Sequence, residues 1–198
     1  MIKSSPDVVK DLLSYGVDFA RDEDGNLAFT KEGAHARNRI LYHKDITGKE
    51  ITSHIYEEVK KQPNIVIKEH WTMVDIICSQ NECCGIVVQK DNGKLDSILA
   101  DYTVLASGGI GGIYRYSTNY RHLTGDAVAL AIRHGVELKD IDYVQIHPTT
   151  FYSEKEEDRS FLISESVRGE GAQLFDKNRQ RFTDELLPRD ILTHNIKK

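Results

Sequence analysis

One short segment of the chain concentrates charged residues and glycines. Residues 165–171 read E-S-V-R-G-E-G, so two acids, an arginine and two glycines stand within seven consecutive residues. Charges are seldom crowded beside glycines only to cover a surface, and the segment therefore indicates a polar site. A surface turn held by ion pairs is the alternative interpretation of the same residues.

Two other segments carry cations that are suited to an anionic ligand. Arg189 stands between Pro188 and Asp190 at the expected start of a helix, where backbone N–H groups and a guanidinium both present donors to a carboxylate. Residues 31–39, K-E-G-A-H-A-R-N-R, form a dense charged loop. Cations spread over distant segments are compatible with a dicarboxylate ligand. Ordinary solvated charges are the alternative in both segments.

Three features further along the chain have both a structural and a functional interpretation. The glycines of residues 108–112 follow an expected buried strand, and they either make a turn or let the backbone approach a cofactor. They do not form G-x-G-x-x-G, because Tyr114 occupies the last position. Asp126 starts an expected helix, where an acid favours the helix dipole or accepts hydrogen bonds from a sugar. His147, held by Pro148, is either a core histidine or a site residue.

The elements expected to position these residues mix helices and strands. Helical spacing of apolar residues predicts helices over residues 7–15, 48–60 and 125–134, a helical turn over residues 164–168, and a helix from residue 188. A period of two predicts strands over residues 65–70, 73–79, 84–89 and 98–106, with a hairpin turn at residues 91–93. Residues 143–147 are strand-like, and residues 174–182 predict a hairpin. The mixture predicts an α/β nucleotide-binding domain.

Composition excludes several classes of function. The 198-residue chain has a formal charge of −5, with 26 basic and 31 acidic residues and no extended basic stripe, which gives no support for nucleic-acid binding. Its apolar runs are far shorter than the ~20 residues of a membrane helix, and residues 1–6 have no apolar signal region. The sequence therefore predicts a cytoplasmic protein.

Three cysteines, Cys78, Cys83 and Cys84, lie close together in the sequence. Their odd number argues against a disulfide framework, and no second pair of ligands stands at metal-binding spacing. We interpret them as reduced structural thiols and predict no metal site, with a redox or metal role as the alternative.

Taken in order, these segments resemble the L-aspartate oxidase family of the fumarate reductase and succinate dehydrogenase flavoprotein superfamily. Residues 30–41, T-K-E-G-A-H-A-R-N-R-I-L, resemble the family's T-[RK]-E-G-[GA]-H-[SA]-R-x-R-I-L, and residues 104–109, V-L-A-S-G-G, resemble its V-L-A-T-G-G. The further matches are residues 45–48, 114–119, 124–126, 147–149, 165–171 and 188–190. Each motif alone is weak, whereas the ordered set is specific.

The resemblance implies a fold and a set of site residues. It implies a partial FAD-binding, Rossmann-like domain with a β-meander over residues 1–147, and the beginning of an α+β substrate-capping domain over residues 148–198. It implies FAD as the cofactor and Arg189 as the catalytic residue, with Glu32 meeting the substrate α-ammonium group. The other implied residues are His147, Ser164 and Glu165 around the substrate carboxylates, and Ala106, Ser107, Gly108, Gly109 and Asp126 at the FAD.

The implied reaction converts L-aspartate to iminoaspartate, with oxygen or fumarate as the electron acceptor. The product feeds NAD biosynthesis, which implies a functional link to quinolinate synthase. The family's pyrophosphate-binding glycine motif is not found in this sequence, so we expect an internal fragment that is inactive alone.

Two alternatives are a fragment of a fumarate reductase or succinate dehydrogenase flavoprotein subunit, which binds another dicarboxylate, and a non-catalytic product of a truncated or split gene. Glu32 favours the aspartate enzyme over the first, because a substrate without an amine needs no such acid.

Overall fold

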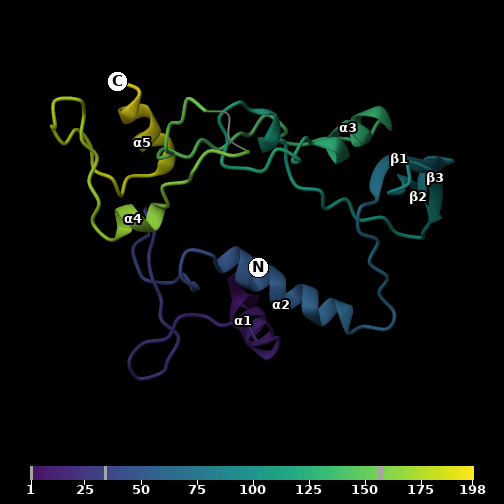
Figure 1. The fold of residues 1–198 in the computed structure, drawn as a ribbon, viewed down its shortest axis with the longest axis horizontal. Coiled ribbons are helices and arrows are strands. Elements are labelled where there is room, and N and C mark those ends of the chain that lie inside the picture. The colour runs from purple at the N-terminus through teal and green to yellow at the C-terminus, as the bar shows by residue number, and fades with distance from the viewer. Residues whose placement is uncertain (1, 34, 156–157) are drawn as a thin grey trace. The chain divides into compact units, whose positions relative to one another are not determined.

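The computed structural model describes residues 2–33, 35–155 and 158–198, so Ala34 of the charged loop lies outside the described residues. The chain divides into two compact units, one formed by Met1–Ile67 with Ser164–Lys198 and the other by Lys68–Ile163. Each unit is described by itself (Figure 1).

The first unit is mainly helical. It contains the 3-10 turn η1 (Ile2–Ser4) and the helices α1 (Ser5–Ser14), α2 (Thr47–Lys60), α4 (Glu165–Gly169) and α5 (Arg189–Ile196). Its buried apolar residues include Val17, Phe19 and Leu192, and Leu192 is fully buried. The four helices confirm the helical segments predicted for this unit from apolar spacing.

The charged loop of the first unit is closed at its base by the backbone. Thr30 and Ile40 form an isolated antiparallel bridge, in which each N–H donates to the carbonyl of the other at 3.0 Å. The loop over residues 31–39 is therefore held at both ends. Glu32 lies in this loop and belongs to the same unit as α4 and α5.

The second unit contains a three-stranded antiparallel meander of β1 (Thr72–Ser79), β2 (Glu82–Gln89) and β3 (Leu95–Leu99), in the order β1-β2-β3. Gln80 and Asn81 join β1 to β2, and both have positive φ, as a two-residue type I′ turn requires. The unit also contains η2 (Gly111–Ile113) and α3 (Asp126–Arg133), whose buried face is Ala127, Leu130 and Ala131. Helices together with a meander confirm the predicted mixed α/β class.

Two predicted strands are absent from the described part of the chain, and a third is shorter than predicted. Residues 65–70 and 143–147 form no strand, and β3 ends at Leu99 instead of continuing to residue 106. A strand needs a partner for its backbone N–H and C=O groups, and no described strand pairs with residues 65–70, 101–106 or 143–147. Their side chains are correspondingly open, with Val104 86% and Tyr143 79% exposed. The predicted hairpin at residues 174–182 is reduced to one bridge, between Phe175 and Arg181.

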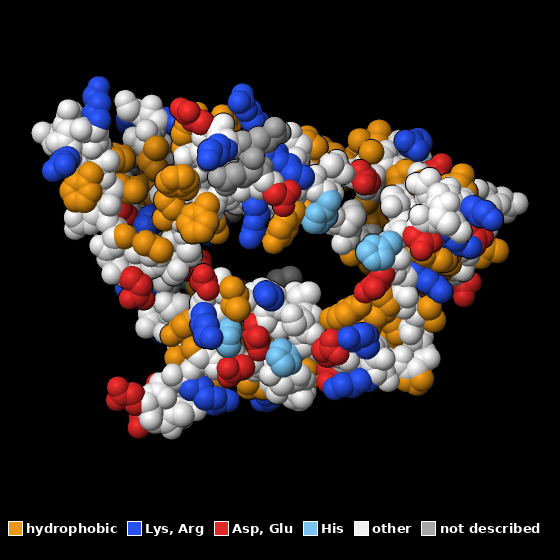
Figure 2. Space-filling view, in the orientation of Figure 1, with side chains coloured by type: hydrophobic (Ala, Val, Ile, Leu, Met, Phe, Trp, Pro, Cys, Tyr) orange, Lys and Arg blue, Asp and Glu red, His pale blue; other side chains and the backbone are white. Residues whose placement is uncertain are grey.

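Large apolar side chains lie on the surface of both units, as the orange atoms of Figure 2 show. None of the described helices has the length and apolar character that crossing a bilayer requires.

The domain boundary expected between residues 147 and 148 stays a prediction.

Candidate functional site

Arg189 and Glu165 form the centre of a charged cluster in the first unit. Arg189 is the first residue of α5, and its Nε donates to Glu165 Oε2 at 2.8 Å while its Nη2 donates to the same oxygen. Glu32 Oε2 lies 3.9 Å from that Nη2. The structure thus brings together three of the predicted site residues, from the charged loop, α4 and α5.

Glu165 is buried and contacts two arginines. Its side chain is only 6% exposed, whereas that of Arg189 is 33% exposed. The second carboxylate oxygen of Glu165 lies 3.6 Å from Arg168 Nη2, one turn along α4. A buried carboxylate is stable only when cations or hydrogen bonds compensate its lost hydration. Here two guanidinium groups provide that compensation.

Gly33 lies against the Glu165 carboxylate where the charged loop passes α4. A Cβ placed on Gly33 would lie 2.5 Å from Glu165 Oε1, which is inside van der Waals contact. Every other residue type at position 33 would therefore displace the carboxylate or the loop. The glycine in the E-G-A-H-A-R segment is explained by this close approach.

Ser164 starts α4. Its Oγ accepts the N–H of Ser166 at 3.3 Å and lies 2.7 Å from the Ser166 hydroxyl. An N-cap of this kind satisfies a backbone donor that the helix itself leaves free. Ser164 is thus placed next to Glu165 with its hydroxyl engaged in the start of the helix.

Arg168, which the sequence analysis did not single out, is the most buried cation of the cluster. Its side chain is 2% exposed, and its Nη1 donates to the Glu185 carbonyl at 2.7 Å. Its Nε and Nη2 are buried without a hydrogen-bond partner among the described residues. Burial of an arginine inside E-S-V-R-G-E-G depends on tertiary packing, so residue type and spacing alone could not reveal it.

Glu185 links this cluster to the Phe175–Arg181 bridge. It accepts the Leu174 N–H at 2.7 Å and hydrogen bonds from Arg181 Nε at 3.2 Å and Nη2 at 2.7 Å. The Arg181 guanidinium, with the Leu174 N–H in support, lowers the pKa of the Glu185 carboxyl from 4.5 to about 2, against the opposing effect of burial. The i, i+4 spacing of Arg181 and Glu185 is the only sequence signal for this pair.

Replacing Glu185 with glutamine is expected to destabilise the chain in a pH-dependent way. The folded-state pKa is lowered, so the carboxylate contributes its full stability above pH 4.5 and loses it as the pH falls towards 2. The difference in urea-unfolding free energy between wild type and Glu185→Gln should therefore shrink over that interval. Glu170→Gln, which changes an exposed carboxylate at the end of α4, is the control. A difference that does not change with pH would contradict the assignment.

Residues 106–109 of the second unit present an open backbone. Ala106, Ser107, Gly108 and Gly109 are all exposed, and a Cβ on Gly109 would meet nothing within 4 Å. Gly108 has φ +78°, a left-handed conformation that favours glycine. A bare backbone of small residues fits close approach by a large cofactor.

The neighbouring glycines, Gly111 and Gly112, are explained by close packing. A Cβ on Gly112 would lie 2.6 Å from the carbonyl oxygens of Tyr120 and Arg121, so the glycine permits two backbone segments to pack. The glycine cluster thus combines an open position at Gly109 with a packed part at residues 111–112, while a Cβ on Gly108 would lie 3.1 Å from Leu123 Cδ2.

Asp126 is exposed at the first turn of α3. Its Oδ1 accepts the Thr124 hydroxyl at 2.8 Å. Gly125 precedes it in the left-handed conformation, with φ +78°. A carboxylate fixed by a hydroxyl at a helix start fits the recognition of a polar cofactor chain.

His147 lines a cavity of about 540 Å³ within the second unit. The cavity wall also contains Gly111, and Tyr114 and Asn119 from residues 114–119, which the resemblance identified. The ring Nδ1 lies 3.0 Å from the Thr149 carbonyl and 3.3 Å from its N–H. These contacts fix the orientation of the ring.

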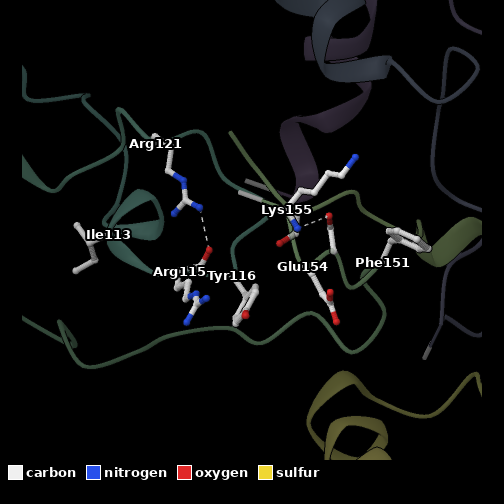
Figure 3. A pocket seen from close by; sticks show the side chains of 9 residues that line it. Ile113, Arg115, Tyr116, Arg121, Phe151, Glu154 and Lys155 are labelled. Atoms are coloured by element: carbon white, nitrogen blue, oxygen red, sulfur yellow. Dashed lines mark hydrogen bonds between the residues drawn. The ribbon is translucent and has the colours of Figure 1, made fainter. Parts of the chain in front are cut away.

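A second cavity of the same unit, of about 640 Å³, is lined by Arg115, Arg121 and Lys155 with Tyr116 and Phe151 (Figure 3). Arg121 donates to the backbone carbonyls of Tyr114 at 2.6 Å and Arg115 at 2.8 Å. These bonds hold the chain after η2 in place. Among the described residues, no group of three or more histidine, cysteine, aspartate and glutamate side chains is arranged to hold a metal ion.

The chain is similar to curated L-aspartate oxidases. It is 52% identical to the enzyme of Clostridium perfringens over 196 residues, which covers 99% of this chain and 44% of that protein. It is 46% identical to the enzyme of Clostridium acetobutylicum over 187 residues, which covers 94% of this chain and 43% of that protein. The chain therefore spans less than half the length of these relatives.

Solved structures of related flavoproteins match the chain as well. A quinol fumarate reductase from E. coli matches with a TM-score of 0.89 at 27% identity, over 98% of this chain and 36% of that one. A flavocytochrome c3 fumarate reductase matches with a TM-score of 0.73 at 29% identity, over 99% of this chain and 35% of that one. The family model described as an FAD binding domain matches residues 1–198. The chain therefore belongs to the FAD binding domain family, whose cofactor is FAD, and within it is similar to the L-aspartate oxidases.

Proposed function

We propose that this chain forms the carboxylate-binding and part of the flavin-binding machinery of an FAD-dependent L-aspartate oxidase. The enzyme converts L-aspartate to iminoaspartate, and oxygen or fumarate takes up the electrons. The observation that carries the proposal is the Arg189 guanidinium, bound to buried Glu165 and 3.9 Å from Glu32. The 52% identity to an L-aspartate oxidase supports it.

In this proposal Arg189 binds a substrate carboxylate and takes part in proton transfer. Glu165 holds its Nε and Nη2, so the guanidinium is oriented before the ligand arrives. An arginine held in this way loses little conformational freedom when its remaining N–H groups meet a carboxylate. The planar fork of donors matches the two oxygens of such a group.

Glu165 acts through Arg189. Both of its oxygens face arginines, and a second carboxylate brought against it would be repelled. We therefore assign Glu165 as a positioning residue that keeps Arg189 in place. Ser164 supports it by capping α4. The contact of His147 with a substrate carboxylate, which the resemblance implies, stays a prediction.

Glu32 recognises the α-ammonium group of the substrate. Its side chain is 36% exposed, and its distance of 3.9 Å from Arg189 Nη2 leaves it only weakly paired. A carboxylate in this position attracts the ammonium group that distinguishes aspartate from succinate and fumarate. That chemistry favours the aspartate enzyme over the alternative of a succinate or fumarate flavoprotein.

When bound, FAD accepts the hydride that leaves the substrate Cα. Ala106, Ser107, Gly108 and Gly109 would lie along the cofactor with their open backbone, and Asp126 would accept hydrogen bonds from its hydroxyl groups. The protein is further proposed to act in the cytoplasm and to supply a quinolinate synthase in NAD biosynthesis.

A chimaera tests the proposed substrate. In it, this chain replaces the matching segment of the Clostridium perfringens relative, so that the segments flanking the match are present. We expect the chimaera to bind FAD and to oxidise L-aspartate in preference to succinate, whereas the 198-residue chain alone, which has no G-x-G-x-x-G turn, should bind FAD weakly. A flavin-loaded chimaera that oxidises succinate and leaves L-aspartate unchanged would assign the site to the rival class.

A further inference from the structure

A cysteine, a histidine and an aspartate form a chain of contacts in the second unit, whereas the Arg189 cluster belongs to the first. His134, directly after α3, places Nε2 at 2.6 Å from Asp75 Oδ1 and Nδ1 at 3.5 Å from Cys78 Sγ. On a regular strand, residues three apart point to opposite faces. The strand pairing is irregular between Ile77 and Cys78, and both side chains of β1 reach the same imidazole.

The two ring nitrogens of His134 contact different partners, and this difference assigns a role to each nitrogen. Asp75 is an acceptor, so the Nε2–H of a neutral His134 donates to it and the lone pair lies on Nδ1. That lone pair faces the Cys78 thiol and can take its proton. The contact with His134, followed by the Ile76 N–H, lowers the pKa of the Asp75 carboxyl, which keeps it charged beside the ring. A base placed beside a thiol in this way is the arrangement that activates a cysteine as a nucleophile.

A second thiol lies opposite the first. Cys78 pairs with Cys83 across the β1–β2 hairpin, one pair from the Gln80-Asn81 turn. Residues directly opposite in an antiparallel pair have Cβ atoms about 4.5–5.5 Å apart, close to the 3.5–4.5 Å of a disulfide. The Thr103 side chain, followed by the Gly85 backbone, lowers the pKa of the Cys83 thiol. Both thiols are free and exposed.

A small ligand can reach this group. Cys78, Cys83, Thr103 and His134 line one cavity of about 380 Å³ in the same unit. Cys84, the third cysteine, is not in this lining and does not pair with Cys78 across the strands. Its Sγ donates to the Glu82 carbonyl at 3.6 Å. Cys84 is half-buried whereas Cys78 is exposed, so it serves as a control thiol together with His134→Gln, which leaves the sequence around Cys78 unchanged.

We propose that Cys78 is a peroxide-reactive thiol, with His134 as its base and Cys83 as its resolving thiol. His134 Nδ1 takes the Cys78 proton, and the sulfur attacks one oxygen of hydrogen peroxide. The O–O bond breaks, and the departing hydroxide takes the proton from His134 and leaves as water. Cys78 is oxidised to a sulfenic acid, and the peroxide is reduced.

The second step closes a disulfide. Cys83, as its thiolate, attacks the Cys78 sulfur, the S–O bond breaks, and the leaving hydroxide combines with the proton from Cys83 to form water. In sum, two thiols and one hydrogen peroxide give one disulfide and two waters. The proposal uses no residue of the Arg189 cluster and stands independently of the proposed function.

The test exposes the 198-residue chain to a small dose of hydrogen peroxide, traps sulfenic acid with dimedone and maps each cysteine by mass spectrometry. We expect a Cys78–Cys83 disulfide in the wild type and in Cys84→Ser. We expect a trapped sulfenic acid at Cys78 in Cys83→Ser, and no Cys83 oxidation at that dose in Cys78→Ser. Cys78 should react about 100-fold faster than Cys84 in the same chain, the lower end of what a positioned base contributes.

His134→Gln tests whether His134 acts as a base for Cys78 or only packs against it. The variant should lower the rate at which Cys78 reacts with hydrogen peroxide to a value near that of Cys84. After long exposure to peroxide, Cys78 should still form its disulfide with Cys83. Asp75→Asn should lower the rate less. His122→Gln, which changes an exposed histidine stacked on Tyr120, should have no effect. Equal reaction rates at Cys78 and Cys84, which need no variant to measure, would overturn the proposal. So would an unchanged rate in His134→Gln.

Discussion

Arg189→Leu in the chimaera is expected to lose almost all L-aspartate oxidation while FAD remains bound. The change removes a carboxylate-binding cation and leaves Glu165, whose side chain is 6% exposed, with one arginine fewer. Removing one partner of a buried charge pair costs about 2–5 kcal/mol, which corresponds to a fall of about 30-fold to several thousandfold in kcat/KM. The loss should be accompanied by weaker binding of dicarboxylate inhibitors.

Arg189→Lys separates charge from shape. It keeps the positive charge but replaces the planar fork by a single ammonium group, which cannot hold Glu165 and a substrate carboxylate together as a guanidinium does. Turnover should fall less than in the leucine variant. Arg133→Leu, at an exposed position on α3, is the control for the loss of a surface guanidinium.

Flavin content is measured in every variant, so that loss of fold is not mistaken for loss of chemistry. Near-native turnover of Arg189→Leu at full flavin occupancy would show that the arginine is an ordinary charge at a helix start. The assignment of the site would then be wrong.

Glu32→Gln is expected to change substrate preference. The carboxylate attracts the α-ammonium group of aspartate and has no such partner in fumarate. Because Glu32 is partly exposed, we expect an effect at the lower end of the range for charge pairs, about 2 kcal/mol or about 30-fold in kcat/KM for L-aspartate. Fumarate reduction by the same variant should change much less.

Glu23→Gln, in an exposed turn of the same unit, controls for the loss of one negative charge. Equal losses on L-aspartate and fumarate in Glu32→Gln would mean that Glu32 only shapes its loop. Glu32 would then not explain a preference for L-aspartate over a dicarboxylate without an amine.

The sequence predicted much of the site, because charged residues next to glycines can be recognised from the sequence alone. It could not predict that Glu165 and Arg168 are buried, since their burial depends on how α4 packs against the charged loop and the Glu185 turn. The residue that reveals this packing is Gly33, where any Cβ would strike Glu165. Spacing also indicates that Arg189 starts a helix, but not which carboxylate it meets.

The helices were predicted more accurately than the strands for a physical reason. A helix satisfies its backbone within itself, so α1, α2 and α3 follow from local apolar spacing. A strand depends on a neighbour, and residues 102–106 and 143–147 have strand-like patterns without a described partner. The sequence predicted a polar turn between the strands at residues 73–79 and 84–89, but not the positive φ of Gln80 and Asn81, because neither residue is a glycine.

The most direct test of the central claim is anaerobic rapid mixing of the flavin-loaded chimaera with L-aspartate. We predict that the flavin absorbance bleaches, that deuterium at the substrate Cα slows the bleaching, and that succinate bleaches the flavin far more slowly. Arg189→Leu should bleach slowly with both substrates. A chimaera that holds FAD and is not bleached by L-aspartate, or is bleached equally by succinate, would contradict the account.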